Sequence, residues 1–194
     1  MIFNPGIKMT EKFRDPEFVM FVGPMFSSKT SRLLTALDRC KYQNKKIIAF
    51  KPKIDGRYSE DKIVTHAGAS WPAENVSSGD EILQKSQDFE VIAVDEAFMI
   101  DGCAEVLLRL FKQGKTIYVS SVQLSATGQA FEEVKNMMPW ATKIEVCPSV
   151  CTVTQRDAYY TVRKISCLDE ISVGGAESYI PVCWELAPFM RNND

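Results

Sequence analysis

Residues 23–30 read Gly-Pro-Met-Phe-Ser-Ser-Lys-Thr and separate a predicted strand from a predicted helix. The preceding run 18–22 is continuously apolar, as expected of a buried strand, and Leu33, Leu34 and Leu37 follow on one helical face. A loop that opens a helix points unpaired backbone N–H groups, and the positive end of the helix dipole, at one spot. Anions bind well there, so the stretch predicts a phosphate-binding loop.

This octet follows the nucleotide-binding spacing G-x-x-x-x-G-K-[ST] except at one position, because Ser28 stands where the second glycine is expected. Lys29 is predicted to place its charge on the β- and γ-phosphates, and the Thr30 hydroxyl to hold Mg²⁺. A Cβ at position 28 can crowd the close approach of backbone and phosphate. The alternative is an ordinary strand-to-helix turn with a solvated lysine. The residues assigned to phosphate binding in this stretch are Gly23, Met25, Phe26, Ser27, Ser28, Lys29 and Thr30.

A second strand end completes the pattern. The apolar run 91–94 leads directly into Asp95 and Glu96. Asp95 is expected to share the Mg²⁺ shell with Thr30. Glu96 projects toward a second substrate, where a carboxylate can deprotonate a hydroxyl or a water. The alternative is an acidic strand end that caps the next helix, but the joint presence of both halves favours a nucleotide site.

Up to residue 146 the apolar pattern alternates between strand and helix lengths, which predicts an α/β domain with a parallel sheet. The first strand, the helix after the loop and a strand over 47–50 form one βαβ unit, so these two strands are expected to be parallel neighbours. The other predicted elements are strands over 91–94, 116–120 and 143–146 and helices that begin near Ser78 and cover 101–112 and 131–138.

The loop after the strand 47–50 leaves the carboxyl end of that strand, where open α/β sheets bind ligands. Asp55 and Arg57 are therefore candidates for the phosphate and Mg²⁺ environment, although each reads equally well as a solvated loop charge. A short strand is predicted over 63–66. It ends in His66, the only histidine of the chain, for which a structural role is the default interpretation.

After Cys147 helical periodicity stops, and the runs 159–164 and 177–182 alternate as strands do. Cys147 and Cys151 precede this hairpin and Cys183 closes it, which is the layout of a zinc ribbon.

The predicted zinc set is one ligand short. Its first pair has three residues between the cysteines instead of two, and Leu186 occupies the place of a fourth ligand after Cys183. Cys167 could substitute only if the hairpin brought it near. The alternative is a small β lobe held by packing alone. The chain is thus expected to divide into a flexible leader over 1–16, an α/β domain over 17–146 and a small β lobe over 147–194.

Composition narrows the class of protein. The 194 residues carry a net charge of −2, with 45% hydrophobic and 25% charged residues, which suits a globular chain in water. This charge and a pI of about 5.6 argue against nucleic acid as a main partner. Six cysteines are too sparse for a disulfide scaffold, and neither a membrane span nor a secretory signal is evident, so a cytoplasmic protein is expected.

Three stretches together resemble the type II thymidine kinases, and the resemblance runs from about residue 17 to 186. They are the octet 23–30, the pair Lys51-Pro52 with 55–58 and Thr65-His66, and Val-Gly-Gly-Ala-Glu-Ser-Tyr at 173–179. The resemblance implies a RecA-like P-loop domain, a small zinc-containing lobe and a lasso loop that closes over the nucleoside. It also implies transfer of the ATP γ-phosphate, with Mg²⁺, to the 5′-hydroxyl of thymidine or deoxyuridine by a homotetramer.

The resemblance also implies roles for single residues. Glu96 is the general base, Asp95 belongs to the Mg²⁺ environment, and Tyr179 packs on the thymine while neighbouring backbone groups bond its polar edge. The nucleoside-binding residues implied in this way are Met25, Phe98, Phe131, Ser178 and Tyr179.

The chain departs from this family at several positions besides Ser28. Ala97-Phe98 follows the acidic pair where the family has a small residue, glutamine and phenylalanine. Gln123 and Ala126 replace an aspartate and an aromatic residue in the loop beside the base. A diverged nucleotide-binding protein with little or no kinase activity is therefore an alternative, and so is an ATPase in which Glu96 activates water.

Overall fold

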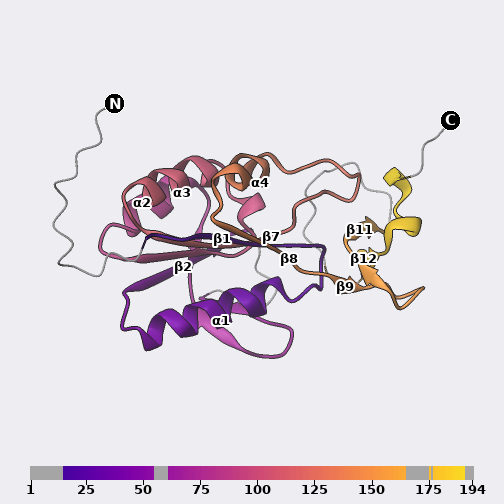
Figure 1. Ribbon diagram of the computed structural model, residues 1–194, viewed down its shortest axis with the longest axis horizontal. Coiled ribbons are helices and arrows are strands. Elements are labelled where there is room, and N and C mark those ends of the chain that lie inside the picture. Colours follow the sequence, from indigo (N-terminus) through magenta and orange to yellow (C-terminus); the bar gives the residue numbers. More distant parts are fainter. Residues whose placement is uncertain (1–14, 55–60, 165–174, 176, 191–194) are drawn as a thin grey trace.

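The computed structural model describes residues 15–54, 61–164, 175 and 177–190. Its centre is a sheet of six strands in the order β5-β2-β6-β7-β1-β8 (Figure 1). Every strand pairing in this sheet is parallel, which confirms the predicted α/β class. The strands are β1 (Phe18–Val22), β2 (Ile47–Pro52), β5 (Glu74–Val76), β6 (Val91–Val94), β7 (Thr116–Ser121) and β8 (Lys143–Val146).

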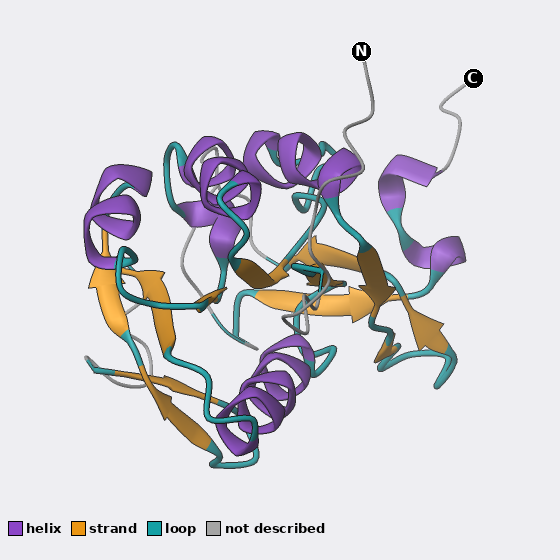
Figure 2. Cartoon of the chain, turned by 60° about the vertical axis from the view of Figure 1, so that its left-hand side comes forward, coloured by secondary structure: helices purple, strands orange, loops and turns teal. Residues whose placement is uncertain are grey.

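Helices cover both faces of the sheet (Figures 1 and 2). On one face Val19 of β1 packs in a cluster with Leu37 of α1, and on the other Met20 packs with Leu107 of α3. Strands buried on both sides read as continuous apolar runs, which is why β1 and β6 were predictable. The α-helices are α1 (Lys29–Tyr42), α2 (Gly79–Lys85), α3 (Cys103–Lys112) and α4 (Glu132–Met137), and the short 3₁₀-helices are η1 (Ala97–Met99), η2 (Met138–Trp140), η3 (Trp184–Leu186) and η4 (Pro188–Met190).

Strands β1 and β2 are not neighbours, so the predicted adjacency was wrong. β7 pairs with β1, β6 pairs with β2, and β6 and β7 pair with each other between them. Strands β1 and β2 run parallel to each other as predicted, but β6 and β7, which come later in the sequence, lie between them. This order brings the carboxyl ends of β1 and β6 to either side of β7, which is a favourable place for a ligand.

Short antiparallel pairs lie outside this sheet. The predicted strand over 63–66 is shorter than expected, and His66 lies in the turn that follows it. The strand pairs near the C-terminus lie beyond one end of the main sheet (Figure 1). The pairs are β3 (Lys62–Val64) with β4 (Ser70–Pro72), β9 (Ser149–Val150) with β10 (Asp157–Ala158), and β11 (Tyr160–Arg163) with β12 (Tyr179–Val182).

Among the helices that the structure describes, none combines the length and the apolar character that a membrane-spanning helix requires.

Candidate active site

Residues 23–30 form a tight loop between β1 and α1. The Ser27 hydroxyl donates a 2.8 Å hydrogen bond to the Pro24 carbonyl oxygen, and the Lys29 amine donates a 2.6 Å bond to the same oxygen. The Lys29 side chain is buried, so its charge lies against the loop rather than in solvent. The Ser27 and Lys29 side chains therefore close the loop through the Pro24 carbonyl oxygen, and the Lys29 ammonium group lies against the loop backbone.

Two residues of this loop adopt left-handed backbone conformations. Ser28, the residue before α1, has φ 59° and ψ 22°, and Phe26 has φ 63°. This conformation costs an L-residue about 1–2 kcal/mol and costs glycine almost nothing. The structure thus gives a backbone reason for the glycine that nucleotide-binding loops place where Ser28 stands. Gly23 is required for a different reason, because a Cβ there would overlap the carbonyl oxygen of Cys147.

Asp95 lies at the end of β6 and reaches the phosphate-binding loop. The Thr30 hydroxyl donates to its carboxylate, with Thr30 Oγ1 3.2 Å from Oδ1 and 3.4 Å from Oδ2. The Ser120 hydroxyl, from the end of β7, donates a short hydrogen bond to the same carboxylate. A hydroxyl and a carboxylate side by side are oxygen donors of the kind that Mg²⁺ prefers. The donor set therefore fits the Mg²⁺ that the sequence predicts.

Glu96 follows directly and has φ 50° and ψ 45° just before η1. Of the five non-glycine residues with positive φ in the described ranges, three (Phe26, Ser28 and Glu96) lie at this site. Sparsely populated backbone conformations persist where the surroundings hold them, and they concentrate at functional sites. The conformation of Glu96 turns the chain sharply between β6 and η1.

These elements enclose a hollow of about 320 Å³. One wall is the phosphate-binding loop, and Asp95 and Glu96 form another. The third wall is the turn after β3, where the His66 ring packs 5.4 Å from the Phe26 ring, measured between centroids. The lining residues are Met25, Phe26, Ser27, Ser28, Lys29, Thr30, Ser31, Val64, Thr65, His66, Ala67, Asp95 and Glu96.

The C-terminal segment contacts the phosphate-binding loop from outside the main sheet. The Met25 N–H donates a 3.0 Å hydrogen bond to the Thr161 hydroxyl of β11. The Ser149 hydroxyl of β9 donates a 3.2 Å bond to the Phe26 carbonyl oxygen. Both hydroxyl-bearing side chains are buried. The loop is therefore held by residues that follow it by more than a hundred positions.

Of the residues implied for nucleoside binding, Phe98 and Phe131 lie together. Their ring centroids are 4.4 Å apart, and both line a second hollow of about 580 Å³ with Met99 and Gln129. In the loop that joins β7 to α4, Gln123 Oε1 is buried and has no hydrogen-bond partner among the described residues.

Tyr179 begins β12 and is buried. Its hydroxyl accepts a 2.9 Å hydrogen bond from Nη2 of Arg163, whose guanidinium lies over the Tyr179 ring at 5.4 Å. The neighbouring Ser178 N–H donates to the Gly175 carbonyl oxygen at 3.0 Å. Arg163 and Tyr179 are partners in the β11–β12 pair. This is the same strand pair that contains Thr161, the acceptor of the Met25 N–H.

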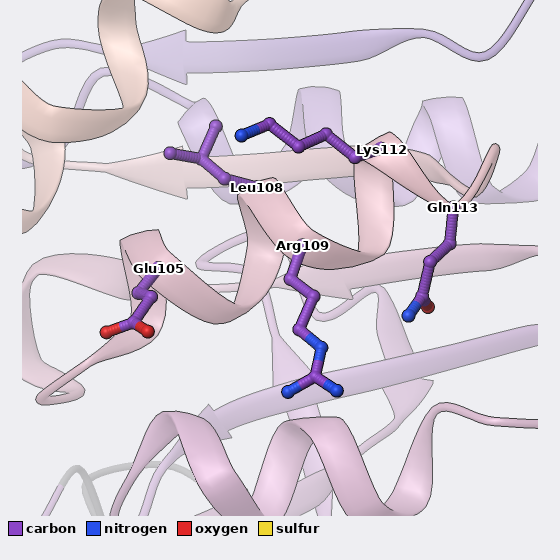
Figure 3. Close-up of a pocket in the computed structure, with 5 residues that line it drawn as sticks. All are labelled: Glu105, Leu108, Arg109, Lys112 and Gln113. Carbon is purple, nitrogen blue, oxygen red and sulfur yellow. The ribbon is translucent and has the colours of Figure 1, made fainter.

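Other candidates lie elsewhere. Asp55, Arg57 and Cys167 fall outside the residues that the structure describes. A further hollow on α3, lined by Glu105, Leu108, Arg109, Lys112 and Gln113, shares no residue with the loop site (Figure 3).

The predicted zinc ligands are not brought together as expected. Cys147 is buried in the core cluster of β1 and α1, where its N–H donates to the Val22 carbonyl oxygen at 2.7 Å and burial raises the pKa of its thiol. Cys151 and Cys183 pack in a separate cluster. Among the described residues, no three or more His, Cys, Asp or Glu side chains are grouped so that they could hold a metal. Cys147 lies in the core because the pairing of β8 with β1 continues past Val146 and includes it.

Sequence reasoning missed three residues of the site. Ser120 orients Asp95, Thr161 anchors Met25, and His66 lines the hollow. A polar residue at the carboxyl end of a predicted parallel strand was a usable signal for Ser120. No local signal marked Thr161, because its partner is distant in sequence.

The loop 23–30 after β1, and an acidic pair after β6 with one strand between, form the arrangement expected of a P-loop nucleotide-binding protein, and the parallel sheet fits a Rossmann-like or RecA-like core. A family model described as thymidine kinase matches residues 17–186, which is most of the chain. The chain belongs to the thymidine kinase family, and the resemblance predicted from sequence is confirmed.

Proposed function

We propose that this protein transfers the γ-phosphate of ATP to the 5′-hydroxyl of thymidine or deoxyuridine. The observation that supports this most is the hydrogen bond between Thr30 and Asp95. It joins the phosphate-binding loop to a strand end that also carries Glu96, so a phosphate cradle, a donor set for Mg²⁺ and a carboxylate share one hollow. Phosphoryl transfer requires mainly positioning and charge neutralisation, which these parts supply. Membership of the thymidine kinase family supports the reaction class.

In the proposed reaction, the backbone N–H groups at the start of α1 and the Lys29 amine bind the phosphates. The amine then exchanges its bond to the Pro24 carbonyl oxygen for a bond to a phosphate oxygen. Thr30 and Asp95 would hold Mg²⁺, which when bound neutralises negative charge on the phosphates. Glu96 accepts the proton of the 5′-hydroxyl as that oxygen attacks the γ-phosphorus, and ADP leaves.

The nucleoside is proposed to lie on the side of the loop that faces Met25. Thr161 fixes Met25 there, and the strand pair that contains Thr161 also carries Tyr179, whose ring is proposed to pack on the base. Phe98 and Phe131 are proposed to bound the base from the other side. Ser178 is proposed to bond the polar edge of the base through its backbone N–H, which would give up its bond to the Gly175 carbonyl oxygen.

A nucleotide-binding protein without turnover is the second candidate function. It is favoured by the left-handed conformation of Ser28 and by the buried Gln123 Oε1, which has no hydrogen-bond partner in the described part of the chain and stands where the family has an aspartate. It predicts MgATP binding with no nucleoside monophosphate formed. An ATPase would hydrolyse ATP at the same rate with and without nucleoside.

The deciding experiment measures ATP consumption and monophosphate formation with each deoxynucleoside in turn and with none. The proposal predicts thymidylate or deoxyuridylate formation, with ATP consumption that depends on the nucleoside. Product from another nucleoside alone would support phosphoryl transfer as the reaction and would assign the changed nucleoside specificity to the loop around Gln123. MgATP binding without any product would contradict the proposal.

Assembly and cellular location are further proposals that the family resemblance supports. We expect a homotetramer located in the cytoplasm. Light scattering on the purified protein measures the assembly, and a monomer at micromolar concentration would contradict it. We also propose that Asp55 and Arg57 contribute to the phosphate and Mg²⁺ environment, which single alanine variants would test through the KM for MgATP.

A further inference from the structure

The C-terminal segment contains a small buried cluster that differs from the zinc site expected of this family. Cys151, Ala158 and Cys183 form its centre, and Leu186 packs against it. The Thr154 hydroxyl donates a 3.4 Å hydrogen bond to Cys183 Sγ. We call Cys151, Thr154, Cys183 and Leu186 the cysteine cluster.

The spacing within the cysteine cluster is that of a zinc ribbon. Each cysteine is followed three positions later by another member, Thr154 after Cys151 and Leu186 after Cys183. Structural zinc sites use this spacing, and they are closed by four ligands drawn from cysteine, histidine and carboxylates. The spacing therefore indicates that positions 154 and 186 would complete a four-ligand set, and neither carries a usual zinc ligand.

Neither replacement fits zinc chemistry. Leucine has no donor atom, and a neutral threonine hydroxyl is not among the usual ligands of structural zinc. Cys147 cannot take either place, because it is buried in the core cluster of β1 and α1 with its Sγ 3.6 Å from the Glu145 carbonyl oxygen. Two thiols alone leave half of a tetrahedral shell unfilled.

Other contacts connect the two halves of the cysteine cluster. Arg156 Nη2 lies 3.7 Å from Cys183 Sγ, and Arg156 Nη1 donates a 3.2 Å bond to Glu185. The Cys151 N–H donates to the Arg156 carbonyl oxygen at 2.8 Å, which closes the turn that carries Thr154. The Arg156 guanidinium therefore supplies positive charge beside one of the two cysteine sulfurs.

We infer that this chain holds no structural zinc, and that packing of Leu186, the Thr154–Cys183 hydrogen bond and the Arg156 bridge to Glu185 close the cysteine cluster instead. The inference concerns the stability of the fold and does not depend on the proposed function.

The first test is the metal content of the full-length wild-type protein, produced in zinc-supplemented medium and dialysed without chelator. Elemental analysis should find well below one zinc per chain. The melting temperature should not change when EDTA is added. About one tightly bound zinc per chain, together with a fall in melting temperature in EDTA, would overturn the inference; loss of that zinc in Cys167→Ser would then identify the missing ligand.

The second test rebuilds the site. Thr154→Cys combined with Leu186→His completes a four-ligand set, so this variant should bind about one zinc per chain and melt at a lower temperature in EDTA. The matched control is Val153→Cys with Leu186→His, which adds the same ligand types with the thiol one position away, on an exposed residue. The control should bind no more zinc than wild type. Equal zinc in the control and the rebuilt variant would contradict the assignment of positions 154 and 186.

Discussion

The Met25 N–H donates a 3.0 Å hydrogen bond to the Thr161 hydroxyl across 136 positions of sequence. With the bond from Ser149 to the Phe26 carbonyl oxygen, it attaches the phosphate-binding loop to the strand pairs near the C-terminus. One of those pairs also contains Tyr179. The proposed ATP side and the proposed base side of the site are thus connected through the backbone of the loop.

Thr161→Val keeps the shape of the side chain but removes the acceptor. We predict a fall of about 1–2 kcal/mol in the free energy of unfolding, because the Met25 N–H loses its partner in a partly buried place. The nucleoside KM should rise more than the ATP KM, since Met25 is proposed to face the base. Urea unfolding and steady-state kinetics measure both effects. Thr161→Ser keeps the hydroxyl but removes a buried methyl group, so it should lose some stability while keeping the nucleoside KM of wild type. A valine variant with the same nucleoside KM as the serine variant would show that this bond does not hold the loop.

At position 28, a glycine variant should be more stable than an alanine variant, which is the reverse of the usual order. Ser28→Gly relieves a left-handed conformation, a gain that the greater freedom of glycine in the unfolded chain reduces to about 1 kcal/mol or less. Ser28→Ala keeps the strained backbone and serves as the control. Urea unfolding of the two variants should place glycine above alanine in stability. If alanine is the more stable of the two, Ser28 is not strained.

The hydrogen bond from Ser120 should matter for Mg²⁺ more than for folding. Ser120→Ala removes a donor to the Asp95 carboxylate, and hydrogen bonds to charged groups contribute about 1.5–3 kcal/mol. We predict that the Mg²⁺ concentration for half-maximal activity rises roughly tenfold or more. Ser121→Ala is the matched control, because the Ser121 hydroxyl donates to the Val122 carbonyl oxygen instead. The same Mg²⁺ dependence in both variants would show that Ser120 does not contribute to Mg²⁺ binding.

The ring and the hydroxyl of Tyr179 can be tested separately. Tyr179→Phe removes the acceptor of the Arg163 bond but keeps the ring, whereas Tyr179→Ala removes both. If the ring packs on the base, the nucleoside KM should rise by less than about fivefold in the phenylalanine variant and by tenfold or more in the alanine variant. Equal losses in the two variants would assign the role to the Arg163 contact instead. The KM for ATP should change little in either variant.

Much of the fold could be predicted because its signals are local. The apolar runs of β1 and β6 are buried on both faces of the sheet, so each reads as an uninterrupted hydrophobic segment. Leu33 and Leu37 indicated which face of α1 packs in the core. Strand order was not predictable, since the insertion of β6 and β7 between β1 and β2 depends on chain that comes later.

The candidate site, like the fold, was predictable where its signals are local and not where they depend on distant residues. The octet 23–30 and the pair Asp95-Glu96 carry motif spacing, and the structure brings both to one hollow. The partners of these residues carry no motif, because Thr161 is distant from Met25 in sequence. The zinc ligands were predicted from the spacing of cysteines around a hairpin, which includes Cys147. The continued sheet pairing that draws Cys147 into the core leaves no signal in that spacing.

The central claim is that Glu96 acts as general base in phosphoryl transfer to a nucleoside. The most direct measurement is the kcat for thymidine phosphorylation by wild-type protein and by Glu96→Gln, with MgATP affinity measured on both. We predict thymidylate formation by wild type and a kcat about 10²–10⁴-fold lower in the variant, with MgATP affinity preserved. A glutamine variant that turns over at the wild-type rate, or a wild-type protein that binds MgATP and forms no thymidylate, would contradict the account.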